Sequence, residues 1–321
     1  MPSTMALERQ DSSPKQTGDS VYRIGTAGWS YDDWEGVFYP AKRSSRFSAL
    51  AYYHRYFNMV EVDATFYRVM PARLAENWCR DVADHRDFLF SLKLWRGLTH
   101  ERPESFPRNE VNEIRAMCGA LADHGRLGAL LLQFPWSFQF SEENLSYLAR
   151  LLDAFRDHPC AVEVRHSNWQ RDEYRNFLRE RSVAFCNIDQ PAMRDCLPPT
   201  AISTTTAFSY LRLHGRNRAN WFRENTQPGE RYDYLYSAKE IEDLARLARA
   251  LAEQTSRVMV TGNNHFRGQA AANALMLRAA LEGKAERVPT SLSKAFPDLS
   301  NLPVEHREAE ESPTQSDLFD D

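Results

Sequence analysis

Three short segments of this sequence alternate apolar with charged residues: Val60–Asp63 (VEVD), Ala161–Arg165 (AVEVR) and Leu211–His214 (LRLH). Successive side chains of a β-strand point to opposite faces, so each segment would carry its apolar residues on one face and its charged residues on the other. A lone strand of this kind would turn its charged face to water. Three such strands in one chain predict instead a closed parallel barrel, with apolar faces outside and a polar site at its mouth.

Eight segments in all have the composition of strands, and helix-like segments alternate with them. The predicted strands are Tyr22–Thr26, Met59–Asp63, Phe88–Lys93, Ala129–Gln133, Cys160–Arg165, Val183–Asp189, Phe208–His214 and Arg257–Asn263. The predicted helices are Phe47–Phe57, Ala72–Arg80, Glu110–His124, Glu142–Asp157, Asp172–Glu180, Ser237–Gln254 and Ala270–Leu281. Prolines 191, 198 and 199 predict that any helix between the sixth and seventh strands is short or irregular. This order indicates an α/β protein of the (β/α)₈ TIM-type barrel class, with an open doubly wound sheet as the alternative.

The barrel is predicted to be a single domain over residues 21–304, flanked by two disordered segments. Residues 1–20 are rich in Ser, Gln, Asp and Pro, and residues 305–321 carry a net charge of −6, against +3 for the barrel. The sequence has no apolar stretch long enough to cross a membrane and no signal-peptide core, and its five cysteines lack a CxxC spacing. We therefore expect a cytoplasmic protein with reduced thiols and no membrane partner, whose mildly basic barrel permits a phosphate-bearing partner.

The site of a (β/α)₈ barrel lies at the carboxyl ends of its strands, and here those ends carry ionisable residues that would be costly to bury without a partner or a ligand. The candidate catalytic residues are Glu61, Lys93, His100, Glu163 and His214, and the candidate ligands of a divalent metal are Glu61, Glu163, Asp189, His214 and His265. The candidate substrate-binding residues are Thr26, Trp29, Tyr67, Gln133, Arg165, Trp169, Arg212, Asn263 and Asn264. The structural alternative is that Glu163–Arg165 and Lys93–Glu61 are ion pairs that plug the mouth, that Asp63 caps the following turn, and that the tryptophans only pack loops.

Three chemistries fit this ring of residues. Metal-assisted hydrolysis or isomerisation would use the metal set, although no HExxH-like spacing supports it. Metal-free acid–base chemistry would use Glu163 or Glu61 as the base and His214, His100 or Lys93 as the acid. Anion binding without chemistry would use Lys93, Arg165, Arg212 and the basic loop 216–223, in which Trp221 and Phe222 lie among arginines in a pattern that also fits nucleic acid. The sequence lacks the motifs GxxxxGKS/T, GxGxxG and GxSxG, so nothing in it supports a P-loop, dinucleotide-binding or serine-hydrolase protein.

Several of these residues belong to short motifs. The motifs are Ile24–Tyr31 (IGTAGWSY) with Trp34 and Gly36–Pro40 (GVFYP); Val60–Val62 with Thr65–Tyr67 (TFY); Lys93 with Thr99 and His100; Gln133–Pro135 (QFP); Glu163–His166 with Trp169; Tyr210–Gly215 (YLRLHG); and Asn263–His265 followed by Ala272–Ala274. In this order the sequence resembles the YecE-like family, the proteins with domain of unknown function 72. The resemblance implies a TIM-type barrel and assigns no activity.

Two positions depart from the pattern of that family. Asp63-Ala64 stands where the family commonly has Asn-Ser, and Thr261-Gly262 stands where it tends to have an aromatic residue before the Asn-Asn pair. We therefore expect the mouth of this barrel to be more acidic and more open.

The acidic tail carries a candidate partner-binding peptide. Gln315, Leu318 and Phe319 resemble the QxxLF peptide with which many bacterial proteins dock on the DNA polymerase sliding clamp. The leading hypothesis is therefore an enzyme that acts on nucleic acid or another phosphate ester, such as a metal-dependent nuclease or phosphodiesterase linked to DNA repair or replication. The alternatives are a carbohydrate-active or isomerase-type barrel enzyme and a non-catalytic nucleic-acid-binding adaptor.

Overall fold

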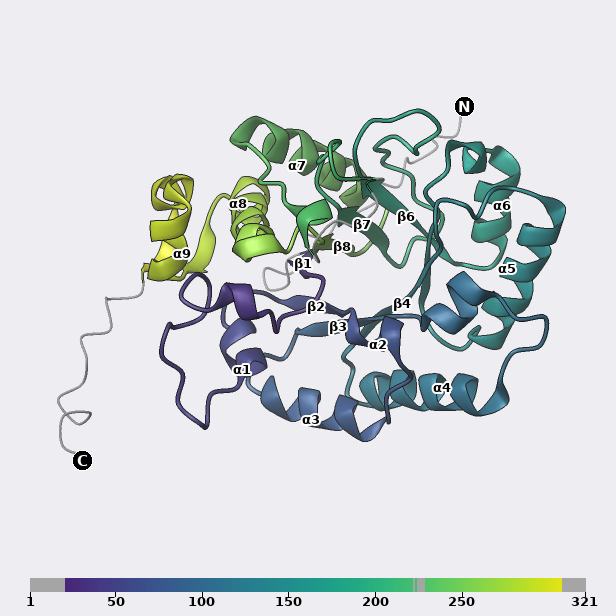
Figure 1. The fold of residues 1–321 in the computed structure, drawn as a ribbon, viewed down its shortest axis with the longest axis horizontal. Coiled ribbons are helices and arrows are strands. Elements are labelled where there is room, and N and C mark those ends of the chain that lie inside the picture. Colours follow the sequence, from purple (N-terminus) through teal and green to yellow (C-terminus); the bar gives the residue numbers. More distant parts are fainter. Residues whose placement is uncertain (1–20, 222, 224–228, 308–321) are drawn as a thin grey trace, which may run out of the picture.

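Eight parallel strands close into a barrel in the computed structural model of the chain, which describes residues 21–221, 223 and 229–307 (Figure 1). The strands are β1 (Tyr22–Thr26), β2 (Met59–Val62), β3 (Leu89–Lys93), β4 (Leu127–Gln133), β5 (Cys160–Glu163), β6 (Ala184–Asp189), β7 (Ser209–Leu213) and β8 (Val258–Gly262). They are hydrogen-bonded in the order β1-β8-β7-β6-β5-β4-β3-β2, and a bridge between Ala27 and Glu61 joins the two ends of this series. The predicted (β/α)₈ barrel is confirmed, and the open doubly wound sheet is wrong.

Helices surround the strands on the outside of the barrel (Figure 1). The longer helices are α3 (Arg73–Asp81), α4 (Arg108–Asp123), α5 (Glu142–Ala154), α6 (Asp172–Glu180), α7 (Ala238–Ala252) and α8 (Gln269–Glu282), and the shorter ones are α1 (Ala49–Tyr53), α2 (Ala64–Tyr67) and α9 (Thr290–Ala295). Side-chain caps fix where several of them begin. Ser237 and Glu240 form a capping box at the start of α7, in which each side chain bonds the backbone N–H of the other residue.

Most of the predicted elements form within a few residues of the expected bounds, but one helix is shorter than predicted, and helices α2 and α9 and strands β9 and β10 were not predicted. Helix α1 covers only Ala49–Tyr53 of the predicted helix Phe47–Phe57. A helix predicted nowhere, α9, is followed by a strand, β10 (Val304–Arg307), which pairs in parallel with β9 (Ala285–Val288). Regular structure therefore extends past residue 304, where the tail is predicted to begin. The connection between β6 and β7 contains no helix among its described residues, as its prolines predict.

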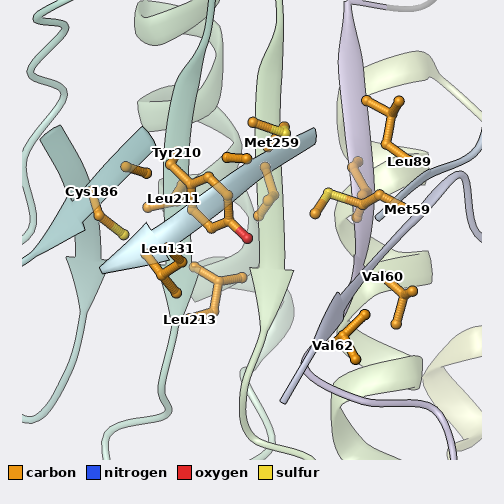
Figure 2. Close-up of a cluster of buried hydrophobic side chains, with 14 of the residues drawn as sticks. Met59, Val60, Val62, Leu89, Leu131, Cys186, Tyr210, Leu211, Leu213 and Met259 are labelled. Atoms are coloured by element: carbon orange, nitrogen blue, oxygen red, sulfur yellow. The ribbon is translucent and has the colours of Figure 1, made fainter. Parts of the chain in front are cut away.

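The apolar faces of the strands point outward, as the alternation predicts. Val60, Val62, Leu211 and Leu213 are at most 2% exposed and belong to the continuous apolar core between strands and helices. Figure 2 shows part of this core, with these four side chains on β2 and β7. Burying a side chain of this size contributes roughly 1.5–3 kcal/mol, so the outward faces hold the barrel together and free the inward faces for polar residues.

The barrel closes between β1 and β2 through side chains as well as backbone. The Asn58 side chain accepts a hydrogen bond from the N–H of Ile24 (2.7 Å) and donates one to the carbonyl of Tyr22 (3.0 Å). The Tyr53 hydroxyl accepts from the N–H of Thr26 (2.8 Å) and donates to the carbonyl of Met59 (3.1 Å). Two side chains thus satisfy backbone groups that a regular strand ladder would otherwise pair.

Gly25 permits this close approach of β1 and β2. A Cβ atom at position 25 would lie 1.9 Å from the carbonyl oxygen of Met59 and 2.9 Å from the Tyr53 hydroxyl. Neither the backbone of β2 nor the buried tyrosine can move aside without breaking the bonds that close the barrel.

We therefore predict that Gly25→Ala lowers the free energy of unfolding by about 3 kcal/mol, because the added methyl group forces β1 and β2 apart. Gly119→Ala is the matched control, since position 119 lies on α4 with no atom within 4 Å of an added Cβ. The control should gain up to about 1 kcal/mol from the better helix propensity of alanine. Urea unfolding followed by circular dichroism measures both; equal stabilities of the two variants would contradict the role given to Gly25.

None of the helices in the described part of the chain has the length and apolar character that crossing a membrane requires. All five cysteines are free and buried. Gln315, Leu318 and Phe319 lie outside the described residues, so clamp docking stays a prediction.

Candidate functional site

An ion cluster inside the barrel joins three of the strands. Arg212 on β7 donates to both oxygens of Glu61 on β2, from Nη2 to Oε1 (2.6 Å) and from Nε to Oε2 (3.0 Å). Its remaining Nη1 donates to Oε2 of Glu163 on β5 (2.5 Å). All three side chains are fully buried. The three alternating segments of the sequence therefore meet at one guanidinium, whose planar fork suits two carboxylates.

His214 extends this cluster from the end of β7. Its Nδ1 lies 2.9 Å from the side-chain nitrogen of Asn263, which can only donate, so Nε2 carries the proton and donates to Oε1 of Glu163 (3.1 Å). Burial lowers the pKa of His214 to about 3, although the neighbouring Glu163 carboxylate acts in the opposite direction. The imidazole is therefore neutral near pH 7 and fixed in one tautomer.

The two buried carboxylates have opposite pKa shifts. Burial raises the pKa of Glu61, and the attraction of Arg212 and Lys93 offsets this only in part. Burial acts on Glu163 in the same direction, but Arg212, His214 and Arg165 outweigh it and hold the pKa of Glu163 well below its usual range. Environments that shift the pKa values of two neighbouring carboxylates in opposite directions are frequent at functional sites.

A second ion pair lies nearer to water, between Lys93 at the end of β3 and Asp63 after β2. Nζ of Lys93 lies 2.9 Å from Oδ1 of Asp63 and 4.0 Å from the centre of the Phe66 ring. Burial acts to raise the pKa of Asp63, but Lys93 outweighs it, so the pKa is lowered and the carboxylate is ionised. Two expectations are corrected here. Lys93 pairs with Asp63 rather than with Glu61, and the Asp63 side chain makes no capping bond to α2.

The expected pair of Glu163 and Arg165 does form, with Nε of Arg165 2.8 Å from Oε1 of Glu163. The same guanidinium lies 5.7 Å from the centre of the Trp221 ring, and that ring lies 6.0 Å from the ring of His214. Trp221 is buried, so it covers these two side chains instead of facing a nucleic acid. Arg216 of the same basic loop is also occupied, by Asp189 (2.7 Å) and Glu240 (2.9 Å). Trp221 and Arg216 are therefore not available to contact nucleic acid, which weakens that interpretation of the loop.

His100 lies in a single π-helical turn, η2 (Gly97–Glu101), which ends at Arg102 in the left-handed region (φ 52°). Single π-helical turns are rare and are often found at functional sites. The ring of His100 is half-buried, with Nδ1 2.9 Å from the Thr99 hydroxyl and its centre 4.9 Å from that of Phe66. Burial and the positive charges of Lys93, Arg165 and Arg96 together lower the pKa of His100 to about 4, although the Glu163 carboxylate acts in the opposite direction.

A pocket of about 730 Å³ opens beside Asp63. It is lined by Tyr31, Asp32, Asp33, Asp63, Tyr67, Gly229, Arg231, Tyr232, His265 and Phe266. Sequence reasoning found Asp63, Tyr67 and His265 but missed the other aromatic residues. Tyr31 could have been found, because it ends the first motif; Tyr232 has no motif around it.

Several predicted substrate-binding residues instead support the barrel from within. Trp169 is fully buried against Phe138 and donates to its carbonyl (2.6 Å), so it offers no surface to a ligand. Arg212 is fully buried with all three nitrogens paired, so it is not available to phosphate. The other predicted residues that bond mainly to the protein itself are Thr26, Gln133, Asn263 and Asn264. Trp29 is half-buried, with its ring edge against Trp78.

The predicted metal ligands do not converge. Glu61 and Glu163 both bind Arg212, Asp189 binds Arg216 and accepts from the Tyr236 hydroxyl (2.7 Å), and the ring of His265 stacks on Tyr31. Within the described ranges, no group of three or more His, Cys, Asp or Glu side chains is placed to hold a metal ion. The prediction of this metal set is corrected, because a buried guanidinium occupies the position between the two carboxylates.

Comparisons with known proteins agree with this barrel. A family model described as "Protein of unknown function DUF72" matches residues 23–298. The UPF0759 protein YunF of Bacillus subtilis is 29% identical over 262 residues, which are 78% of this chain and 91% of that protein. A crystal structure of a DUF72 family protein from Thermotoga maritima is 34% identical with a TM-score of 0.72, over 81% of this chain and 99% of that one. One from Enterococcus faecalis is 26% identical with a TM-score of 0.69, over 81% and 95%.

We predict that Arg212→Met lowers the free energy of unfolding by about 3–5 kcal/mol, because it leaves two buried carboxylates without their cation. Arg246→Met is the control, since Arg246 pairs with Asp243 on the exposed face of α7 and its side chain is 68% exposed. Loss of that surface pair should cost at most about 1 kcal/mol. Chemical unfolding of both variants decides the matter, and a similar cost for each would show that the buried cluster contributes no more than a surface pair.

The lowered pKa of His214 predicts a dependence of stability on pH. In the unfolded chain this histidine takes up a proton below about pH 6.5, whereas in the folded barrel its pKa is about 3. Its contribution to stability is therefore complete above about pH 6.5. It is lost as the pH falls from about 6.5 towards the folded pKa of about 3, at up to ~1.4 kcal/mol per pH unit. We expect His214→Gln to make the fall between pH 7 and pH 5 less steep in urea unfolding experiments. An unchanged slope would mean that His214 is not held neutral.

Proposed function

The chain belongs to the DUF72 family of proteins of unknown function, and from the mouth of its barrel we propose that it is an enzyme that binds the phosphate group of a phosphate ester and acts on it by acid–base chemistry. The observation that carries the proposal is the set of cations around one half-buried histidine. Lys93, Arg165 and Arg96 each lower the pKa of His100, so all three act on the space around its ring. Such a space favours an anion.

Two of these cations keep hydrogen-bond donors for a ligand. Lys93 uses one of the three donors of its ammonium group, on Asp63, and its side chain is 10% exposed. Among the described residues, Arg165 bonds only to Glu163, through Nε, and its side chain is 16% exposed, so both Nη groups keep their donors. Because each cation is already held by a buried or partly buried carboxylate, a phosphate group would meet donors in fixed positions.

A bound phosphate would also change the protonation of His100. Its negative charge offsets the field of the cations that now lower the pKa of the ring, so this pKa rises towards its usual value and the ring takes up a proton from solvent more readily. His100 could then donate that proton to the leaving oxygen of the ester. The Asp63 carboxylate, ionised and 24% exposed, could accept a proton from an attacking water. Phosphate positioning, acid and base would thus come from neighbouring strand ends.

The narrower forms of this proposal concern nucleic acid. A metal-dependent nuclease or phosphodiesterase needs a ligand set that the described residues do not present. A role in DNA repair or replication through the QxxLF peptide concerns residues that the structure does not describe. The contacts above support phosphate binding without requiring either.

The test is an NMR titration of the His100 ring in the full chain with and without inorganic phosphate. We expect phosphate to raise the pKa of His100 from about 4 towards its usual value, because the anion offsets Lys93 and Arg165. Lys93→Met should weaken phosphate binding at least about tenfold, since a hydrogen bond between two charged groups is lost. Lys42→Met, at an exposed lysine away from this set, should not change it.

Turnover is tested on a panel of phosphate monoesters and diesters. Hydrolysis by the wild-type chain that is lost in His100→Gln, while phosphate binding is kept, would support the role of His100 as the acid. A His100 pKa that phosphate leaves unchanged would overturn the proposal, whatever the panel shows.

A further inference from the structure

We propose that the pocket beside the Lys93–Asp63 pair binds the base of a nucleoside, so that the substrate of this enzyme is a nucleoside phosphate. The inference rests on the proposed function, because it places the ring of the substrate next to the phosphate position. Asp63 connects the two places, since it lines the pocket and bonds to Lys93. At about 730 Å³ the pocket has the size of sites that enclose small organic ligands.

The walls of the pocket are aromatic. Tyr31 and His265 stack face to face, with ring centres 4.4 Å apart and planes 3° from parallel, and Tyr232 lies 5.4 Å from His265. These rings come from three loops, after β1, β7 and β8, so separate segments of the chain bring flat side chains to one place. A planar base can stack on such rings, whatever its identity, because every base has a π-face.

Tyr67 completes the pocket from the end of α2. Its side chain is 64% exposed, one of only two large apolar side chains in the described part of the chain that are exposed to water. Tyr232 lines the same pocket from a different segment of the chain. An exposed aromatic ring at the rim of a pocket that contains other aromatic side chains offers a surface on which a flat ligand can pack.

Carboxylates at the same place favour a base that carries amino groups. Asp32 and Asp33 line the pocket together with Asp63. Asp33 uses one oxygen to accept from the N–H of Arg267 (2.6 Å), which holds the loop after β1 against the loop after β8. The remaining oxygens are acceptors only, and amino groups of a base or ribose hydroxyls are donors that they can bind.

The experiment is calorimetric titration of the full chain with inorganic phosphate, glycerol phosphate, glucose 6-phosphate, AMP and UMP. We expect AMP to bind at least about tenfold more tightly than glycerol phosphate, which is the gain that one stacked base gives, and UMP, whose base carries no amino group, to gain less. Tyr67→Ala and Tyr232→Ala should each remove most of that gain and leave the affinity for inorganic phosphate unchanged. Leu235→Ala, which truncates the other large exposed apolar side chain and lies outside the pocket lining, should change neither affinity.

The possible failures are distinguishable. If inorganic phosphate binds but the nucleotides bind no better than glycerol phosphate, the nucleoside site is wrong and the proposed function stands. If glucose 6-phosphate gains as much affinity over glycerol phosphate as AMP does, the pocket binds a sugar ring and its assignment to a nucleoside is wrong. If inorganic phosphate and every ester fail to bind, the proposed function itself is overturned.

Discussion

The pairing of Arg212 with two carboxylates is the interaction on which the interior of this barrel depends. Bringing three charges out of water costs several kcal/mol for each ion, and the cost is offset only when every donor meets an acceptor. Here each nitrogen of the guanidinium has a carboxylate oxygen, and the Tyr210 hydroxyl donates a further bond to Glu61 (3.0 Å). Because the partners come from β2, β5 and β7, the cluster also fixes how these three strands stand relative to one another.

Glu163 links the buried cluster to the partly exposed side chains at the mouth of the barrel. One of its oxygens accepts from Arg212, and the other accepts from both His214 and Arg165. Arg165 is therefore held by a carboxylate that is itself fixed by the buried cluster, and its guanidinium lies 5.7 Å from the centre of the Trp221 ring. Lys93 is held in the same manner, between the Asp63 carboxylate and the face of Phe66. The cations at the mouth are thus positioned before any ligand arrives, which lowers the entropy that binding must overcome.

The alternation of apolar and charged residues fixes which side chains point inward, and together with the order of strands and helices it predicted the barrel. It could not predict which inward charges pair. Lys93 and Glu61 are on neighbouring strands, yet Lys93 bonds to Asp63, because the height of each side chain in the barrel depends on strand register and tilt. The same limit explains why the predicted metal ligands do not form a site: they lie at the carboxyl ends of the strands, as predicted, but their side chains contact different partners. Tyr232 and Phe266 were missed since loops far apart in sequence meet only in the folded chain.

The paired side chains at the mouth and in the buried cluster below it are equal in number. Three acidic side chains (Glu61, Asp63, Glu163) bond to three basic ones (Lys93, Arg165, Arg212), and His214 is neutral. Because these cations are already paired, the proposed site would bind a phosphate through local hydrogen-bond donors and not through an excess of positive charge. Among the groups there, His100 is the one that is half-exposed, uncharged at neutral pH and held in that state by nearby cations. A bound phosphate would offset the effect of these cations on the pKa of His100. In the proposed site, phosphate binding would therefore itself favour the protonated ring that acts as the acid.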